Sequence, residues 1–151
     1  MREQTLAEFF KGTNSAGELA RGVEGSIKRV GEIGFAIEIE DMEGELAVTS
    51  QMAIALCDAV LAGELPPEAL ETIGFALAAS DKFVWDADED EVLAEVIYDW
   101  SAPEVNVPLT LENVRRFRAW LSRAEPYPAK PATAHGGKII SIKEKKPVRY
   151  S

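Results

Sequence analysis

The sequence is poor in the residues from which most catalytic and metal sites are built. It contains one cysteine, Cys57, and one histidine, His135. A lone cysteine cannot form a disulfide within the chain, and one cysteine with one histidine falls short of the usual zinc ligand set. His135 stands in a Pro/Gly-rich stretch, and Cys57 in an Ala/Leu-rich segment typical of a buried, inert thiol. We therefore expect no metal, no cofactor and no Ser-His or Cys-His nucleophile.

Long apolar runs and phosphate-binding loops are also missing. No run of about 18 apolar residues and no charged-then-apolar leader occurs, which predicts a cytoplasmic protein with no membrane contact. Neither G-x-x-x-x-G-K-(S/T) nor G-x-G-x-x-G is present. With 151 residues, 46% of them apolar, the chain is long enough to bury one core. We predict a single compact acidic domain over residues 1–125. Residues 126–151 are predicted to be a Pro/Gly-rich and then basic C-terminal extension docked on that domain.

Basic residues are nearly absent from the middle of the chain. Residues 32–104 contain 19 acids and one base, a local charge of −18, whereas residues 115–151 contain 10 bases and two acids, a local charge of +8. Like charges at this density repel one another and destabilise the compact state, and secondary structure does not require them. Two interpretations follow: solubility with internal neutralisation by the basic end, or a surface that binds a basic partner.

The acids are densest between Asp81 and Trp100. Eight carboxylates lie in this stretch: Asp81, Asp86, Asp88, Glu89, Asp90, Glu91, Glu95 and Asp99. Apolar residues recur at helical spacing, which predicts an amphipathic helix over 88–100 with carboxylates along its other face. These apolar residues are Val92, Leu93, Val96, Ile97 and Trp100. Two overlapping capping boxes, Asp86 to Glu89 and Asp88 to Glu91, account for part of the acid.

Three of the same acids have the spacing found at the start of a calcium-binding loop. Asp86, Asp88 and Asp90 have the 1, 3, 5 spacing of an EF-hand. The sixth position is Glu91 where the turn needs Gly, and the twelfth is Ile97 where a bidentate Glu is needed. We therefore expect capping and a solvated face here, and no metal site.

Periodicity along the rest of the chain predicts an α+β fold. Four main helices are expected, over 51–62, 67–79, 88–100 and 111–124, with Ser50 and Thr110 as the N-caps of the first and last and Gly63 at the C′ position of the first. The arginines of the last helix are expected to pair in part with the carboxylates of 88–100. Strict alternation over 33–40, a turn ending in Gly44, and further alternation over 45–49 predict an antiparallel hairpin, which a strand at 138–142 would extend. A short helix is expected over 2–11, and repeated glycines predict loop with at most one helical turn over 12–26. Ile27 and Val30 are expected to add a strand before the hairpin. The expected core consists of Phe35, Ile37, Leu56, Val60, Ile73, Leu77, Leu93, Val96, Ile97, Val114, Phe117 and Leu121.

The charge pattern favours a binding protein over an enzyme. The leading hypothesis is a non-enzymatic module whose acidic face docks a basic protein partner. The predicted surface consists of Asp86, Asp88, Glu89, Asp90, Glu91, Glu95 and Asp99, with Trp85 and Tyr98 as neighbouring aromatics. A body of charge −18 repels nucleic acid, so direct nucleic-acid binding is not expected. The alternatives are a carboxylate-dependent hydrolase or other enzyme, and a structural subunit whose charge serves solubility.

In charge and size the chain is similar to small acidic bacterial proteins that bind and block a basic toxin or nuclease. These are the immunity proteins, antitoxins and inhibitors. The resemblance implies a toxin or nuclease as the basic partner, and it transfers no residue.

Overall fold

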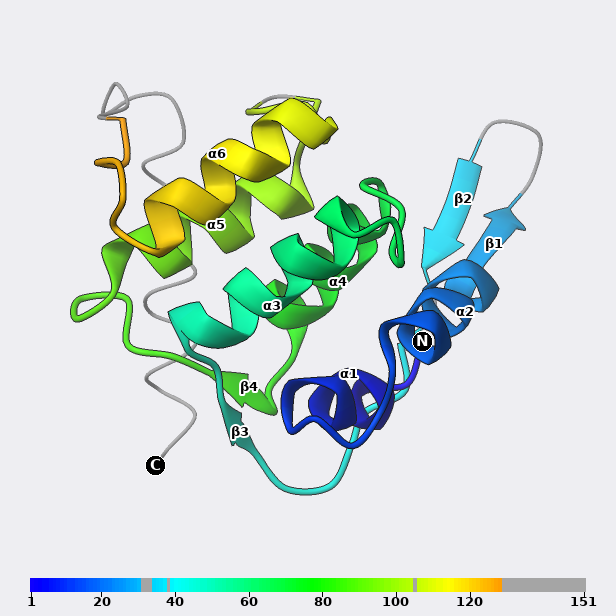
Figure 1. Cartoon of the computed structure of the whole chain (residues 1–151). Helices are drawn as coiled ribbons and strands as arrows, with labels where there is room; N and C mark the ends of the chain where they lie inside the picture. Colours follow the sequence, from blue (N-terminus) through cyan, green and yellow to red (C-terminus); the bar gives the residue numbers. More distant parts are fainter. Residues whose placement is uncertain (31–33, 38, 105, 129–151) are drawn as a thin grey trace.

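The computed structural model describes residues 1–30, 34–37, 39–104 and 106–128, and for 25–30 and 34–37 it describes the backbone. This part of the chain is mostly helical (Figure 1). Its six helices are α1 Glu3–Phe10, α2 Ala16–Ser26, α3 Ser50–Leu61, α4 Ala69–Ala79, α5 Glu91–Ser101 and α6 Leu111–Leu121. Its four short strands are β1 Ile27–Val30, β2 Gly34–Ile37, β3 Leu46–Ala47 and β4 Phe83–Val84. None of these helices is long and apolar enough to cross a membrane.

Helices α3 to α6 form the body of the molecule. Helix α6 packs along α3, and α5 packs along α4. In Figure 1 the α3/α6 pair forms the nearer layer and the α4/α5 pair lies behind it. Contacts between α5 and α6 join the layers, and α2 packs on α4 while α1 packs on α2. The first two helices therefore cover one side of a four-helix body.

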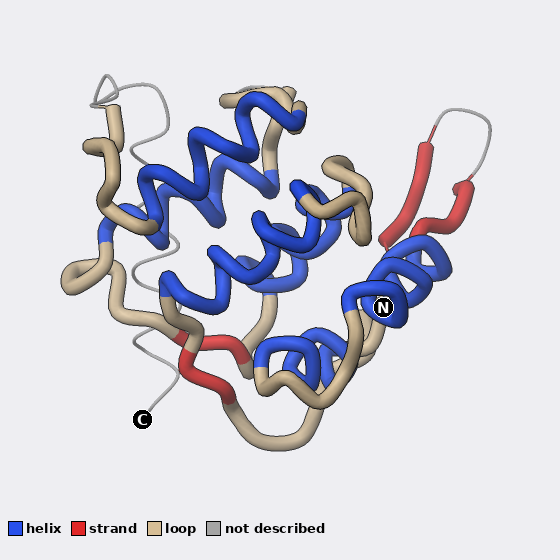
Figure 2. The backbone as a smooth tube through the Cα atoms, viewed as in Figure 1, coloured by secondary structure: helices blue, strands red, loops and turns tan. Residues whose placement is uncertain are grey.

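The predicted α+β class is wrong, because the described residues are mostly helical and form no sheet between 33–40 and 45–49. Residues 34–37 pair antiparallel with 27–30, and not with 45–49. Residues 46–47 instead pair in parallel with 83–84, with Leu46 opposite Phe83. Figure 2 shows these two pairs as separate red segments at different sides of the helices. Alternation of apolar and polar residues correctly predicted strands within 33–40 and 45–49. It could not identify the segments that pair with them, because strand pairing depends on contacts distant in sequence. The proposed strand 138–142 lies outside the described residues.

The four main predicted helices and the short helix expected over 2–11 are confirmed with ends shifted by a few residues, and the described chain contains α2 in addition. Helix α2 contradicts the loop predicted over 12–26. Its glycines lower helix propensity, but Ala16, Leu19 and Val23 share one buried face. The Ser15 hydroxyl accepts a hydrogen bond from the Glu18 N–H at 3.1 Å. Tertiary burial and this cap outweigh the low propensity of the glycines.

The hydrophobic core runs through all six helices as one cluster. Ten of the twelve predicted core residues are buried: Leu56, Val60, Ile73, Leu77, Leu93, Val96, Ile97, Val114, Phe117 and Leu121. The side chains of Phe35 and Ile37 lie outside what the structure describes. Trp100 is fully buried, and its ring meets Phe117 edge-on. Cys57 is buried on α3, as predicted.

Candidate functional site

The acid-rich stretch folds as a compact turn before α5. We call residues 86–91 the acidic turn. The Asp86 carboxylate accepts hydrogen bonds from the Asp88 N–H at 2.9 Å and the Glu89 N–H at 3.3 Å. The Asp90 N–H donates to the Asp86 carbonyl at 2.9 Å. These bonds fix the backbone of the turn, so the carboxylates it carries are presented from a defined frame.

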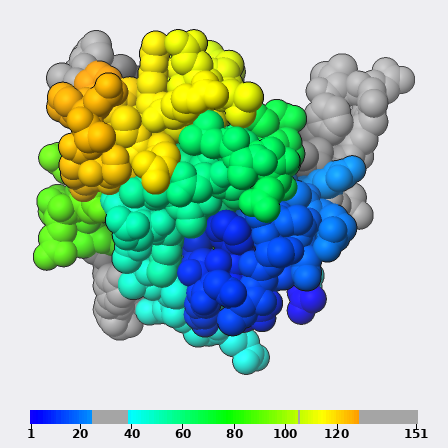
Figure 3. Space-filling view, in the orientation of Figure 1, coloured from blue at the N-terminus to red at the C-terminus, as the bar shows by residue number. Residues whose placement is uncertain are grey.

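Four carboxylates of the acidic turn are exposed: Asp86, Asp88, Glu89 and Glu91. Among the described residues, no Lys or Arg forms an ion pair with Asp86, Glu89 or Glu91. In the space-filling view the segment protrudes in bright green at the left edge of the molecule (Figure 3). The turn is therefore a negatively charged projection that a solute can reach.

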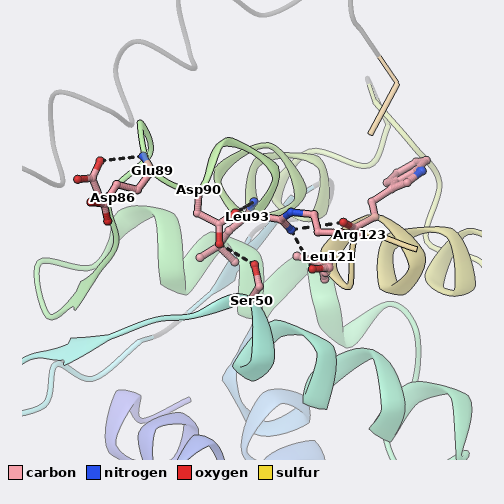
Figure 4. Close-up of polar contacts among 8 residues, drawn as sticks. Ser50, Asp86, Glu89, Asp90, Leu93, Leu121 and Arg123 are labelled. Carbon is pink, nitrogen blue, oxygen red and sulfur yellow. Dashed lines mark hydrogen bonds and ion pairs between the residues drawn. The ribbon is translucent and has the colours of Figure 1, made fainter. Parts of the chain in front are cut away.

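Asp90 has a different role from its neighbours, because it joins three helices (Figure 4). As the N-cap of α5 it accepts from the Leu93 N–H at 3.0 Å. The Ser50 hydroxyl, at the start of α3, donates to its second oxygen at 2.7 Å. Arg123, just after α6, donates at 2.7 Å to Asp90 Oδ1, the oxygen that also accepts from the Leu93 N–H. Partial burial is the largest influence on Asp90 and opposes its ionisation. The bonds from Ser50, Leu93 and Arg123 together outweigh that burial and lower the pKa of Asp90.

Arg123 holds its position with an unusual backbone. Its φ of 65° lies in the left-handed region, where glycine is usual after a helix. Its guanidinium donates to the Leu121 carbonyl at 2.8 Å and to the Trp120 carbonyl at 3.4 Å, as well as to Asp90. One side chain therefore caps the end of α6 and links it to the start of α5. The sequence predicts pairing between the arginines of the last helix and the acids of the helix before it. It does not identify Arg123 and Asp90 as the two partners.

The predicted stripe along α5 is not one open surface. Glu91 is exposed, Glu95 is half-buried, and Asp99 is fully buried. Trp85 and Tyr98 are both 4% exposed, so they contribute to the packing of the domain and do not flank the acids in solvent. Seven of the eleven residues of α5 are buried. The helix therefore exposes only a small part of its surface to solvent. The accessible part of the predicted surface is the acidic turn.

Asp99 lies beneath an aromatic residue that sequence analysis did not identify. The Tyr127 hydroxyl donates to the Asp99 carboxylate at 2.7 Å. The Tyr127 ring meets the Trp120 ring edge-on, with centroids 5.0 Å apart. Burial, then the charge of Asp99 and the hydrogen bond to it, raise the pKa of Tyr127 far above its ordinary value. No local pattern signals this contact, because the two residues are 28 positions apart.

Two arginines of α6 form ion pairs, and one of these pairs neutralises a carboxylate of the acid-rich residues 32–104. Arg118 pairs with Asp58 of α3, and Arg116 pairs with Glu112 one turn earlier in its own helix. Within the part of the chain that the structure describes, the predicted pairing between the last two helices is present at Arg123 and Asp90. Exposed pairs of this kind contribute about 0–1 kcal/mol each, so they orient helices more than they stabilise the fold.

Within the described residues, no three His, Cys, Asp or Glu side chains are grouped to hold one metal ion. Asp86 and Asp90, two of the three aspartates with EF-hand spacing, use their oxygens to bind backbone N–H groups. The arrangement supports electrostatic recognition through the exposed oxygens of the acidic turn.

Comparisons with models of known protein families, with curated proteins and with solved structures gave no match to this chain.

Proposed function

We propose that this protein is a non-enzymatic binding module that docks a basic protein partner through its acidic turn. The observation that carries the proposal is the cluster of four exposed carboxylates within six residues, on a backbone fixed by its own hydrogen bonds. Because the turn is ordered before binding, little conformational entropy is lost on docking. The surrounding negative charge attracts a cationic partner over distance and speeds the encounter.

The partner class is a protein with a cluster of Lys or Arg side chains. Guanidinium groups suit such a site, because their forked donors match carboxylates in bidentate geometry. A toxin or nuclease neutralised in this way is the most specific form of the proposal. The hydrolase and structural-subunit alternatives stay predictions of the sequence.

The test begins with capture of the partner from the native cell by the full chain. Calorimetry then compares the parent with Glu89→Lys/Glu91→Lys, which reverses two exposed charges of the acidic turn. A matched control is Glu43→Lys/Glu64→Lys, which changes net charge equally at two exposed sites outside the turn. We expect the first variant to weaken binding by about tenfold or more and the control to stay within about threefold of the parent. A partner that binds both variants alike would refute this proposal.

A further inference from the structure

Helices α1, α3 and α6 end in the same way, but α6 ends with a different type of residue. Two positions after each helix stands a residue with a left-handed backbone: Gly12 with a φ of 82°, Gly63 with a φ of 80° and Arg123 with a φ of 65°. The N–H of each donates to the carbonyl three residues earlier, at 3.0 Å for both glycines and 3.1 Å for Arg123. A Cβ in this conformation crowds the neighbouring carbonyl, so arginine costs free energy here that glycine does not. The end of α6 therefore does not require arginine, and the reason for it lies in the side chain.

The side chain of Arg123 connects two elements through one rigid group (Figure 4). Its Nη1 donates to the Leu121 carbonyl at 2.8 Å and to the Trp120 carbonyl at 3.4 Å, and its Nη2 donates to Asp90 Oδ1 at 2.7 Å. The side chains of Arg123 and Asp90 are 50% and 26% exposed, so water competes for both and the pair adds little to the stability of the whole fold. A planar guanidinium that is bound on both sides instead fixes the position of Asp90 relative to the end of α6.

The acidic turn is connected to Asp90 by its own hydrogen bonds. The Asp90 N–H donates to the Asp86 carbonyl at 2.9 Å. The Asp86 carboxylate in turn accepts from the Asp88 and Glu89 N–H groups. The backbone that carries the exposed carboxylates is therefore joined to a residue that Arg123 holds.

We infer that Arg123 is a positioning residue for the acidic turn: its forked side chain, acting through Asp90, holds the exposed carboxylates in the orientation that a basic partner meets. Residues with a disfavoured backbone gather at functional sites, where surrounding contacts hold them in place. The effect of Arg123 on binding rests on the proposed function. Its effect on the order of the turn does not.

Hydrogen exchange of the full chain tests the effect on the turn. Arg123→Gly keeps the helix end, where glycine is usual, and removes the fork, whereas Arg123→Lys keeps the charge without the fork. In both variants we expect the amides of Asp88, Glu89 and Asp90 to exchange about threefold faster or more. The thermal unfolding midpoint of Arg123→Gly should stay within about 3 °C of the parent, because glycine relieves the backbone.

The matched control is Arg118→Gln, which removes the other ion pair between the region of α6 and a different helix. It should leave exchange in the acidic turn unchanged. Turn amides that exchange as in the parent in Arg123→Gly, or equal acceleration throughout the domain, would overturn the inference. Full rescue by Arg123→Lys would show that charge alone suffices and would overturn the role of the fork.

Binding of an oligoarginine peptide tests the consequence for recognition. Arg123→Lys has the same net charge as the parent, so the long-range attraction of the peptide is unchanged. We expect this variant to bind the peptide several-fold more weakly, because the turn loses more conformational entropy on docking. Equal affinity would overturn the effect of Arg123 on binding. If the parent itself does not bind, the proposed function fails, and the exchange rates still decide whether Arg123 positions the turn.

Discussion

At the scale of single residues, Asp90 shows how one carboxylate organises the site. The sequence predicts it as one acid among several on a docking face, yet its oxygens accept hydrogen bonds from Ser50, Leu93 and Arg123. These bonds hold the acidic turn, to which Asp90 belongs, against α3 and the end of α6, so the proposed contacts to a partner are the exposed carboxylates beside it. Capping patterns in the sequence placed a helix start here to within three residues, but the choice among Asp86, Asp88 and Asp90 depended on which one met Ser50 and Arg123.

Asp90→Asn should reduce stability in a way that depends on pH. Asn still caps the helix, so the loss of charge-assisted bonding is expected to cost about 1 kcal/mol at pH 7. A lowered pKa in the folded state means that this stabilisation is present above the unfolded pKa of about 3.9 and disappears as pH falls through the lower folded value. Urea unfolding should show the difference between parent and variant at pH 7 and its decline below about pH 4. A difference independent of pH would contradict the assigned bonds.

Cys57 should be unreactive in the folded protein. Burial, and then the negative charge of Asp58, raise the pKa of its thiol to about 12. Only the thiolate reacts with alkylating reagents, so modification by iodoacetamide at pH 8 should await unfolding. Mass spectrometry measures the extent of Cys57 alkylation in native samples and in denaturant. Rapid alkylation of the native protein would show that the thiol is accessible.

At the scale of elements, the sequence was informative about helices and misleading about strand partners. Caps at Thr110 and a C′ glycine at Gly63 were recognised and are present. Ser50 was expected to cap α3, but the cap is Thr49, one residue earlier. Alternation at 33–40 revealed a strand, whereas the parallel pairing of β3 with β4 joins segments about 37 residues apart. No local pattern encodes such a partner.

The crossing of α4 and α5 depends on Gly74. A Cβ at this position would lie 2.7 Å from the Trp100 Cβ and 2.9 Å from the Ser101 nitrogen. Gly74→Ala should therefore lower the free energy of unfolding by about 1–3 kcal/mol, even though alanine is the better helix former.

The matched control for this crossing is Gly22→Ala on α2. There the nearest atom to an added Cβ is the Thr5 Cγ2 at 3.8 Å, an ordinary contact. The control should gain about 0.5–1 kcal/mol from helix propensity. Thermal unfolding of both variants makes the comparison. If Gly74→Ala unfolds at the same temperature as the parent, α4 and α5 do not approach each other at Gly74 as closely as the structure shows.

At the scale of the whole molecule, charge is separated along the chain and only partly paired in space. Arg118 of α6 and Arg123 just after it bring two positive charges onto carboxylates of the acid-rich residues 32–104. The acidic turn stays exposed, so the bipolar sequence is not fully neutralised within the described residues. Composition predicted this asymmetry. It could not predict that most of α5 is buried, because burial of Tyr98 and Asp99 depends on how α4, α6 and the segment after α6 pack around it.

The most direct test of the central claim is the association rate with the captured partner, measured by stopped flow as a function of salt. Docking through the acidic turn predicts that the rate constant for association falls by about tenfold or more between about 0.02 M and about 0.3 M salt, while the dissociation rate constant changes little. Glu89→Lys/Glu91→Lys should associate slowly at low salt and show a much weaker dependence. An association rate insensitive to salt, or a steep dependence retained in that variant, would contradict docking through the acidic turn.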